Sequence, residues 1–256
     1  MQTLSLFNTD CIAGYGLSQA LELAVRIPLR VVHAEVDFVD AAGERLDGFE
    51  SIHHRNETLV GLGDLALELR YRALQQSASQ PLRIDLKAGV SVPTGSIEPD
   101  PFALGRQGRV HQHIFFGTGT FDPRLSVQLN YRLQSVRLSA DTLWMGSLYR
   151  NRYDYRGPMT ITQRALIASR LGAADWLFRI GMELFKEYPA EWRDEQAENS
   201  GRMDLSPLFG VQYTLGPNLM TFVSIKKPFI LTAESATLSV PLVAMFGVQV
   251  GMDGLP

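Results

Sequence analysis

The sequence predicts an all-β fold, an antiparallel transmembrane β-barrel that forms a single domain over residues 1–256. Three observations predict it. Apolar and polar side chains alternate with a period of two, in segments of about ten or more residues. Strands that cross a bilayer need about 9–11 residues, whereas soluble strands most often have about 5–6. The connections alternate between short turns and long loops, which is the layout of an outer-membrane barrel.

The alternation is clearest in GLGDLALELRYRAL, residues 61–74. Its apolar face comprises Leu65, Leu67, Leu69 and Tyr71, and its polar face comprises Glu68, Arg70 and Arg72. Similar segments are found at residues 3–15, 20–31, 81–92, 124–133, 176–184, 209–215 and 237–250, and weaker ones at 164–171 and 219–225. We expect about eleven strands in all.

Short turns are expected at residues 18–19, 76–80, 134–135, 173–175 and 216–218. Long loops are expected at 33–61, 94–120, 149–158, 188–203 and 227–236, where most Gly, Pro, His and clustered charge lies. An odd strand number would place the two ends of the chain on opposite sides of the membrane. Bacterial single-chain barrels have an even number. We therefore expect a barrel of about twelve strands, whose N-terminal strand and signal peptide lie upstream of a late start.

Aromatic side chains cluster near the ends of the expected strands. Those predicted to lie at the lipid interface are Tyr15, Tyr71, Tyr131, Trp144, Tyr149, Trp176 and Tyr213. Two such belts are typical of lipid-facing strands, because these amphipathic rings sit at headgroup level. Aromatic side chains also cap sheets in soluble proteins, so a soluble barrel or sandwich is the alternative.

Charged side chains occupy the polar faces of the expected strands. The set predicted to line the lumen is Glu22, Arg26, Arg30, Glu68, Arg70, Arg72, Arg83, Asp85, Lys87, Arg132, Arg137, Asp141, Arg164, Arg170, Arg179 and Glu183. Such charges either brace a narrow barrel or set the width and field of a pore. Arginine outnumbers acid in this set, so a continuous path would favour anionic or polar-aromatic solutes.

Composition excludes several other classes of protein. A net charge of −3 gives no basic patch for a nucleic-acid partner. The single cysteine, Cys11, cannot form an internal disulfide. No run of about 18 apolar residues predicts a transmembrane helix. The N-terminal stretch lacks the basic and apolar regions of a secretory signal.

Four stretches of the first half carry a resemblance to a known group of proteins: GYGLSQALELAVRIPL, GLGDLALELRYRAL, LKAGVSVPTGS and GTGTFDPRLSVQL. Over roughly residues 13–130 they resemble proteobacterial outer-membrane barrels that include the phenol-degradation meta-pathway family and related families of unknown function. LDGFESIHH (46–54) is similar to a loop motif in one of these families. The resemblance implies a protein of the bacterial outer membrane that passes small, often aromatic or apolar, compounds, and it supplies no catalytic residues.

Few motifs point to catalysis or metal binding. GLGD (61–64) lacks the third glycine of a dinucleotide fingerprint, and we expect Gly61 and Gly63 to supply positive φ at the start of a strand. His111 and His113 would share a face of a strand, which suits a metal only with a third ligand, and loop polarity is the simpler interpretation. The His53–His54 pair is interpreted in the same way.

The function expected from these patterns is a passive channel for small molecules, without enzymatic activity, cofactor or metal. The expected partners are outer-membrane lipid and lipopolysaccharide, the barrel assembly machinery and a small solute. One alternative is a structural or envelope-interaction barrel with a closed lumen. Another is a lipid hydrolase that uses His33 near the outer end of strand 20–31, although no G-x-S-x-G motif is present.

Overall fold

The computed structural model describes residues 2–38, 40, 42, 44, 46, 55–170, 175–233 and 239–251. Eleven strands follow one another in a continuous antiparallel path, in the order β1-β2-β4-β5-β6-β7-β9-β10-β13-β14-β16. The first six are β1 (Gln2–Gly16), β2 (Leu21–Val36), β4 (Leu65–Leu74), β5 (Leu82–Val92), β6 (Asp122–Leu133) and β7 (Val136–Met145). The other five are β9 (Thr160–Arg170), β10 (Trp176–Glu187), β13 (Arg202–Gly216), β14 (Leu219–Lys226) and β16 (Val243–Val250).

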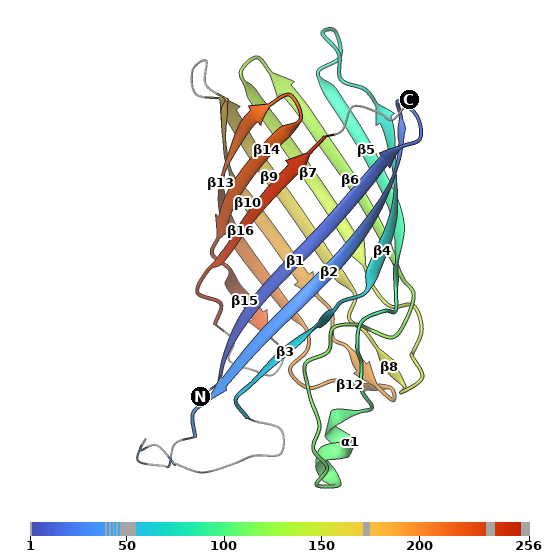
Figure 1. The fold of residues 1–256 in the computed structure, drawn as a ribbon, viewed down its shortest axis with the longest axis vertical. Helices are drawn as coiled ribbons and strands as arrows, with labels where there is room; N and C mark the ends of the chain where they lie inside the picture. The colour runs from blue at the N-terminus through green and yellow to red at the C-terminus, as the bar shows by residue number, and fades with distance from the viewer. Residues whose placement is uncertain are drawn as a thin grey trace.

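The sheet curls into the wall of a barrel, with the short turns at the top of Figure 1 and the long loops at the bottom. Two short strands extend the wall at the long-loop end: β3 (Glu57–Leu62) pairs with β2, and β15 (Phe229–Ala233) pairs with β13. The edges of the path are β1 and β16, which lie at the front of Figure 1. Ten antiparallel steps separate them, so the two edge strands run in the same direction.

The long loops contain secondary structure of their own. A short helix, α1 (Pro101–Arg106), begins where Asp100 accepts hydrogen bonds from the N–H groups of Phe102 and Ala103. An acidic N-cap followed by proline at the first helical position favours such a start. Three two-residue strands, β8 (Tyr155–Arg156), β11 (Glu191–Trp192) and β12 (Glu195–Gln196), form a separate small sheet. No helix in the described part of the chain has the length and apolar character to cross a membrane.

Most of the expected strands and turns are confirmed, but several expected boundaries are wrong. The last strand begins at Val243 rather than at residue 237, after the ring of Pro241, which has no N–H to donate to a ladder. Of the expected 237–250 segment, residues 237 and 238 lie outside the described residues. The loop expected at 33–61 is shorter, because β2 continues to Val36 and β3 begins at Glu57. The loop expected at 188–203 contains β11 and β12, and the loops expected at 149–158 and 227–236 contain β8 and β15. Two strands begin earlier than expected, β9 at Thr160 rather than at residue 164 and β13 at Arg202 rather than at residue 209.

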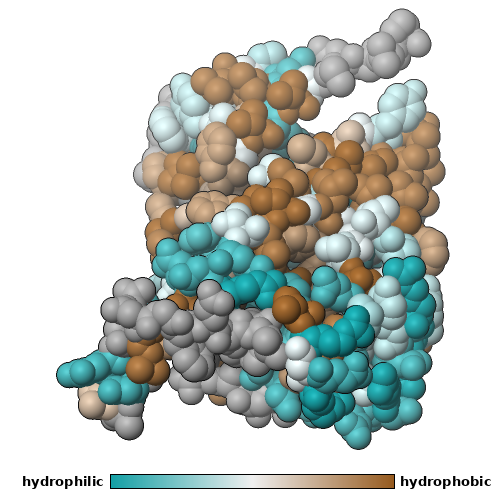
Figure 2. Space-filling view, turned by 60° about the horizontal axis from the view of Figure 1, so that its bottom comes forward, coloured by the Kyte–Doolittle hydropathy of each residue, from teal (hydrophilic) through white to brown (hydrophobic). Residues whose placement is uncertain are grey.

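Burial of apolar and charged side chains is the reverse of that in a soluble sheet. On β4, the outward Leu67, Leu69 and Tyr71 are 43%, 40% and 51% exposed. Asp85 and Glu183, by contrast, are buried, at 0% and 6% exposure. Figure 2 shows apolar side chains over the strand wall, above a hydrophilic rim at the long-loop end. A soluble sandwich would bury the apolar face, so this distribution contradicts the soluble alternative and is the one expected of a wall that faces lipid.

Candidate functional site

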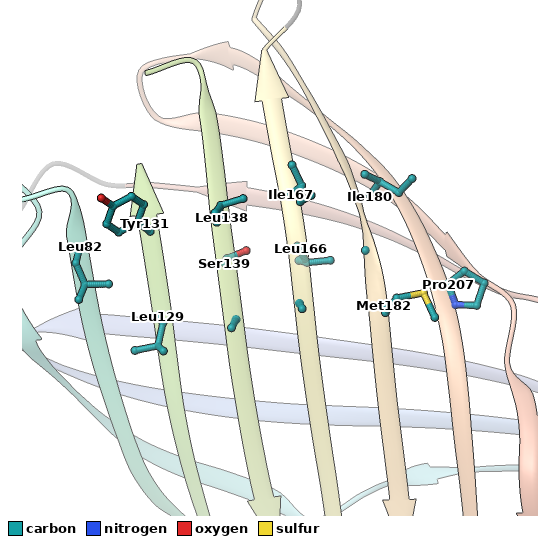
Figure 3. Close-up of a pocket in the computed structure, with 13 residues that line it drawn as sticks. Leu82, Leu129, Tyr131, Leu138, Ser139, Leu166, Ile167, Ile180, Met182 and Pro207 are labelled. Atoms are coloured by element: carbon teal, nitrogen blue, oxygen red, sulfur yellow. The ribbon is translucent and has the colours of Figure 1, made fainter. Parts of the chain in front are cut away.

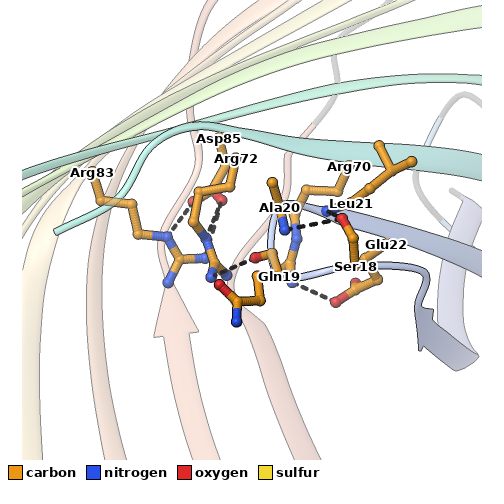
Figure 4. A network of polar contacts seen from close by, with 9 residues as sticks. All are labelled: Ser18, Gln19, Ala20, Leu21, Glu22, Arg70, Arg72, Arg83 and Asp85. Atoms are coloured by element: carbon orange, nitrogen blue, oxygen red, sulfur yellow. Dashed lines mark hydrogen bonds and ion pairs between the residues drawn. The ribbon is translucent and has the colours of Figure 1, made fainter.

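The charged face of the sheet carries ion pairs that join neighbouring strands. Glu22 of β2 accepts a hydrogen bond from Arg70 of β4, its register partner. Next to this pair, the turn before β2 is held by the Ser18 hydroxyl, which accepts from the N–H groups of Ala20 and Leu21 (Figure 4). The expected polar face of β4 is therefore the face that makes these contacts.

Asp85 lies at the centre of the network in Figure 4 and has no exposed surface. Its carboxylate accepts hydrogen bonds from Arg83 Nε at 2.5 Å and Nη2 at 3.2 Å, and from Arg72 Nε at 3.4 Å. Arg72 Nη1 also donates to the Gln19 carbonyl oxygen at 3.4 Å. One buried acid thus holds two guanidinium groups and connects β4 and β5 to the first short turn. This arrangement suits bracing of the wall.

Further ion pairs on the same face involve other members of the predicted set. They are Arg26 and Arg30 with Asp10, Glu68 with Arg124, Asp141 with Arg164, and Glu183 with Lys226. The sequence interpretation missed Asp10, Arg124 and Lys226. Arg124 and Lys226 could have been found, because each continues the polar alternation of its strand. Asp10 required the register, since its partner Pro28 lies between the two arginines along β2.

Five members of the predicted set form no ion pair within the described residues: Lys87, Arg132, Arg137, Arg170 and Arg179. All but Lys87 lie near the short-turn end, on the adjacent strands β6, β7, β9 and β10. The guanidinium of Arg132 donates to the Ser77 carbonyl oxygen at 3.1 Å. The charged face therefore has a paired region and, at one end, a region with excess positive charge.

Three of the motifs quoted above meet at the long-loop end of the wall. Asp64 of GLGD accepts hydrogen bonds from the N–H of Gly95, at 2.8 Å, and of Thr118, at 2.9 Å. The Thr94 hydroxyl accepts from the Leu65 N–H at 2.9 Å. The motifs therefore build a junction between β4, β5 and the approach to β6. The contacts give them a structural role.

The expectation of positive φ at Gly61 and Gly63 is wrong. Among described glycines, only Gly108, Gly119 and Gly201 have positive φ. Instead, a Cβ at Gly61 would lie 2.6 Å from the Phe116 ring, and one at Gly63 would lie 3.0 Å from the ring of Pro28. Glycine is needed here for close approach of the neighbouring chain.

Three long loops pack together around Trp192 at the mouth of the barrel. Trp192 is buried with Ala190 and Ala197, and its ring lies 4.6 Å from that of Tyr155. Burial, followed by the charges of Glu187 and Asp122, raises the pKa of Tyr155 to about 12. The loops therefore form a compact cover for this end of the wall.

The carboxamide of Asn151 ties two of these loops together. Its Nδ2 donates to the Thr118 carbonyl oxygen at 2.8 Å, and its Oδ1 accepts from the N–H groups of Tyr153 and Tyr155. On the outside of the cover, Arg150 donates to Asp194, which raises the pKa of this guanidinium. Hydrogen bonds and apolar packing thus both hold the loops in place.

Two of the loop histidines lie next to each other. His111 and His113 approach each other, with their Nε2 atoms 3.0 Å apart, and His111 Nδ1 donates to the Arg109 carbonyl oxygen. In the described part of the chain, no group of three His, Cys, Asp or Glu side chains is placed to hold a metal. The expected His53–His54 pair lies outside the described residues.

His33 lies on the outward face of β2 near its long-loop end. Its Nδ1 is 2.8 Å from the Thr58 hydroxyl and its Nε2 is 3.3 Å from a carboxylate oxygen of Glu35. A hydroxyl, an imidazole and a carboxylate therefore stand in a row, although the His33 and Glu35 side chains are 43% and 65% exposed. No residue pattern in the sequence predicted Thr58 as a neighbour of His33.

The predicted interface aromatics lie at the two ends of the wall. Tyr15, Tyr71, Tyr131 and Trp176 are exposed near the short turns, and Tyr213 stacks on Trp176 with ring centroids 4.5 Å apart. Tyr149 is exposed at the long-loop end, and Trp144 is partly exposed near the end of β7. The aromatic side chains thus form two groups, one at each end of the wall.

An open apolar depression of about 760 Å³ crosses the outward face between β5 and β13 (Figure 3). Its floor is formed by the small side chains of Ala140 of β7 and Ala165 of β9, which are register partners. Larger side chains, including Leu129, Ile167 and Met182, form its rim. The depression thus lies on the side of the wall opposite the ion pairs and is separate from any path along the charged face.

Comparison with known proteins relates this architecture to solved structures. No protein-family model matches the chain, and no curated protein matches it in sequence. The COG4313 outer membrane channel from Pseudomonas putida F1 is similar in structure, with a TM-score of 0.62 and 12% identity over 98% of this chain and 85% of that one. The NanC porin has a TM-score of 0.53 and 9% identity, over 98% of this chain and 97% of that one. The protein therefore has the fold of an outer-membrane β-barrel.

Proposed function

We propose that the protein lies in the bacterial outer membrane and acts as a passive channel for small solutes. The observation that carries this proposal is the division of the wall into an exposed apolar face and an opposite face of paired charges. A water-filled lumen stabilises charged side chains, and lipid stabilises the apolar face. The fold likeness to an outer membrane channel and a porin supports the same function.

We further propose that the protein belongs to the phenol-degradation meta-pathway type of barrel or to a related family, and that it passes small aromatic or apolar solutes. This proposal is supported by the quoted motifs, which meet in the junction around Asp64. In this proposal the sixteen predicted lumen residues have two roles: the ion-paired members brace the wall, and the unpaired members set the field of the pore.

Conductance in planar lipid bilayers tests the channel directly. We expect stepwise openings after insertion of the purified, folded protein, and a current that scales with salt concentration. Protein that is folded, as judged by heat-modifiable migration on a gel, but gives no conductance would contradict the proposal.

The packed loops around Trp192 favour a second candidate, a barrel whose lumen is closed and whose role is structural or in envelope interactions. The same bilayer measurement separates the two candidates. If the loops alone close the mouth, a variant in which glycines replace Trp192 and Tyr155 should conduct where the native protein does not.

A lipid hydrolase is the third candidate, favoured by the row of Thr58, His33 and Glu35. With its Nε2–H donated to the carboxylate, the neutral imidazole would accept the hydroxyl proton at Nδ1. The assay is hydrolysis of phospholipid vesicles by the native protein and by His33→Ala. Absence of native activity, or activity unchanged in the variant, would exclude His33 as a catalytic base.

A further inference from the structure

Two arginines that form no ion pair with any described residue flank a single alanine on the charged face near the short-turn end. Arg137 of β7 is the register partner of Ala168 of β9, and Ala168 is also the register partner of Arg179 of β10. Adjacent strands lie about 4.8 Å apart, so the two arginine backbones are separated by roughly 10 Å. Ala168 is 5% exposed and offers only a methyl group between them. The two long cationic side chains therefore share one row across three strands.

Among the described residues, this row contains no acid, whereas most other charged side chains of this face are ion-paired. Asp141 and Glu183 occupy the same strands but lie four residues further along, at a separation of roughly 13 Å. That exceeds the Debye length of about 8 Å at physiological ionic strength. Each of these acids is also already paired, with Arg164 and with Lys226. Arg137 and Arg179, by contrast, lie in the same row, and both carry a positive charge.

The surroundings of Arg179 resemble an incomplete anion site. Its Nη2 donates to the side-chain carbonyl oxygen of Gln212, and its guanidinium lies 6.0 Å from the ring centroid of Phe222. Its Nε is buried and has no hydrogen-bond acceptor among the described residues. An anion that reaches this Nε–H would supply its acceptor. Guanidinium groups also bind carboxylates with two parallel hydrogen bonds.

We propose that Arg137 and Arg179 form a binding station for small organic carboxylates that pass along the lumen. The inference rests on the proposed channel function and names its solute class. The carboxylate would accept hydrogen bonds from the two guanidinium groups above Ala168. The Phe222 ring provides an apolar surface for the body of the solute, so an aromatic acid fits better than a simple inorganic anion.

Reversal potentials in a gradient of sodium benzoate test the station. We expect the ratio of benzoate to sodium permeability to fall about tenfold in Arg137→Gln/Arg179→Gln, which corresponds to about 1.4 kcal/mol. Arg164→Gln is the control, because it removes one positive charge from the strand between the two arginines, and it should lower the ratio by clearly less than half as much. A smaller decrease for chloride than for benzoate would support recognition of the carboxylate. An unchanged benzoate ratio in the double variant would overturn the proposal.

A binding measurement keeps the station testable even where the protein gives no current. Sodium benzoate is titrated calorimetrically into folded protein in detergent, with heat-modifiable migration as the check on folding. We expect saturable binding that the double variant loses and Arg164→Gln retains. Equal binding by the native protein and the double variant, or no binding by either, would overturn the station, whereas absent conductance alone contradicts only the channel.

Discussion

Replacement of Asp85 by alanine should strongly destabilise the barrel, because this carboxylate is the fully buried centre of the network in Figure 4. The change removes three hydrogen bonds to guanidinium groups, two from Arg83 and one from Arg72. Breaking a buried ion pair costs about 3–5 kcal/mol, because the remaining charge loses its partner. The two arginine side chains are 31% and 23% exposed, so water can solvate part of their charge. We therefore expect the lower end, about 3 kcal/mol, or roughly 100-fold in the folding equilibrium.

The assay is a urea titration of folding into phospholipid vesicles, followed by the heat-modifiable shift on a gel. Glu22→Ala is the matched control, because it removes a carboxylate from the same network. Glu22 and Arg70 are 32% and 28% exposed, so the loss should be about 1 kcal/mol or less. Equal midpoints for the two variants would refute the conclusion that burial makes Asp85 the brace of this region.

Three further predictions concern the wall and the loops that cover its end. Gly61→Ala should lower the free energy of unfolding by about 1–3 kcal/mol through overpacking, because its Cβ would lie 2.6 Å from the Phe116 ring. Gly16→Ala is the control, because a Cβ there meets no atom within 4 Å, and it should leave the urea midpoint nearly unchanged. Leu67→Arg should lower the stability in vesicles by about 2–4 kcal/mol, since it puts a charge on the outward face; an unchanged midpoint would argue against contact with lipid. Tyr155 has a raised pKa in the folded protein, about 12 against an ordinary 10.0, because the fold favours its neutral form. The stability that Tyr155 contributes is therefore fully present below pH 10 and is lost as the pH rises toward 12. Tryptophan fluorescence should report this loosening of the loops, and Tyr155→Phe should remove the dependence on pH in this range.

The strands and short turns could be predicted because their signals are local. On β4 the period of two separates Leu67 and Leu69 from Glu68 and Arg70, and the exposure of these side chains follows the same division. The strand length then distinguishes a membrane wall from a soluble sheet, since both classes share the alternation itself.

The close approach at Gly61, the loop cover and the division of the arginines into paired and unpaired depend on contacts between residues that lie far apart in the sequence. Gly61 is required by the Phe116 ring, which only the folded loop brings close. The cover around Trp192 joins three loops, and none of them shows a periodic pattern. Among the described residues, the absence of ion pairs at Arg137 and Arg179 follows from the register across β7, β9 and β10. The sequence could therefore predict these arginines as lumen residues but could not separate them from the paired ones.

Cysteine labelling along β4 tests most directly whether the apolar face lies in lipid and the charged face in water. Cys11 is the only cysteine, so Cys11→Ser provides a background for single cysteines at positions 67 to 70. In proteoliposomes, a water-soluble maleimide should react at Glu68→Cys and Arg70→Cys and should spare Leu67→Cys and Leu69→Cys. Equal reaction at all four positions, or reaction at the leucine positions alone, would contradict the account.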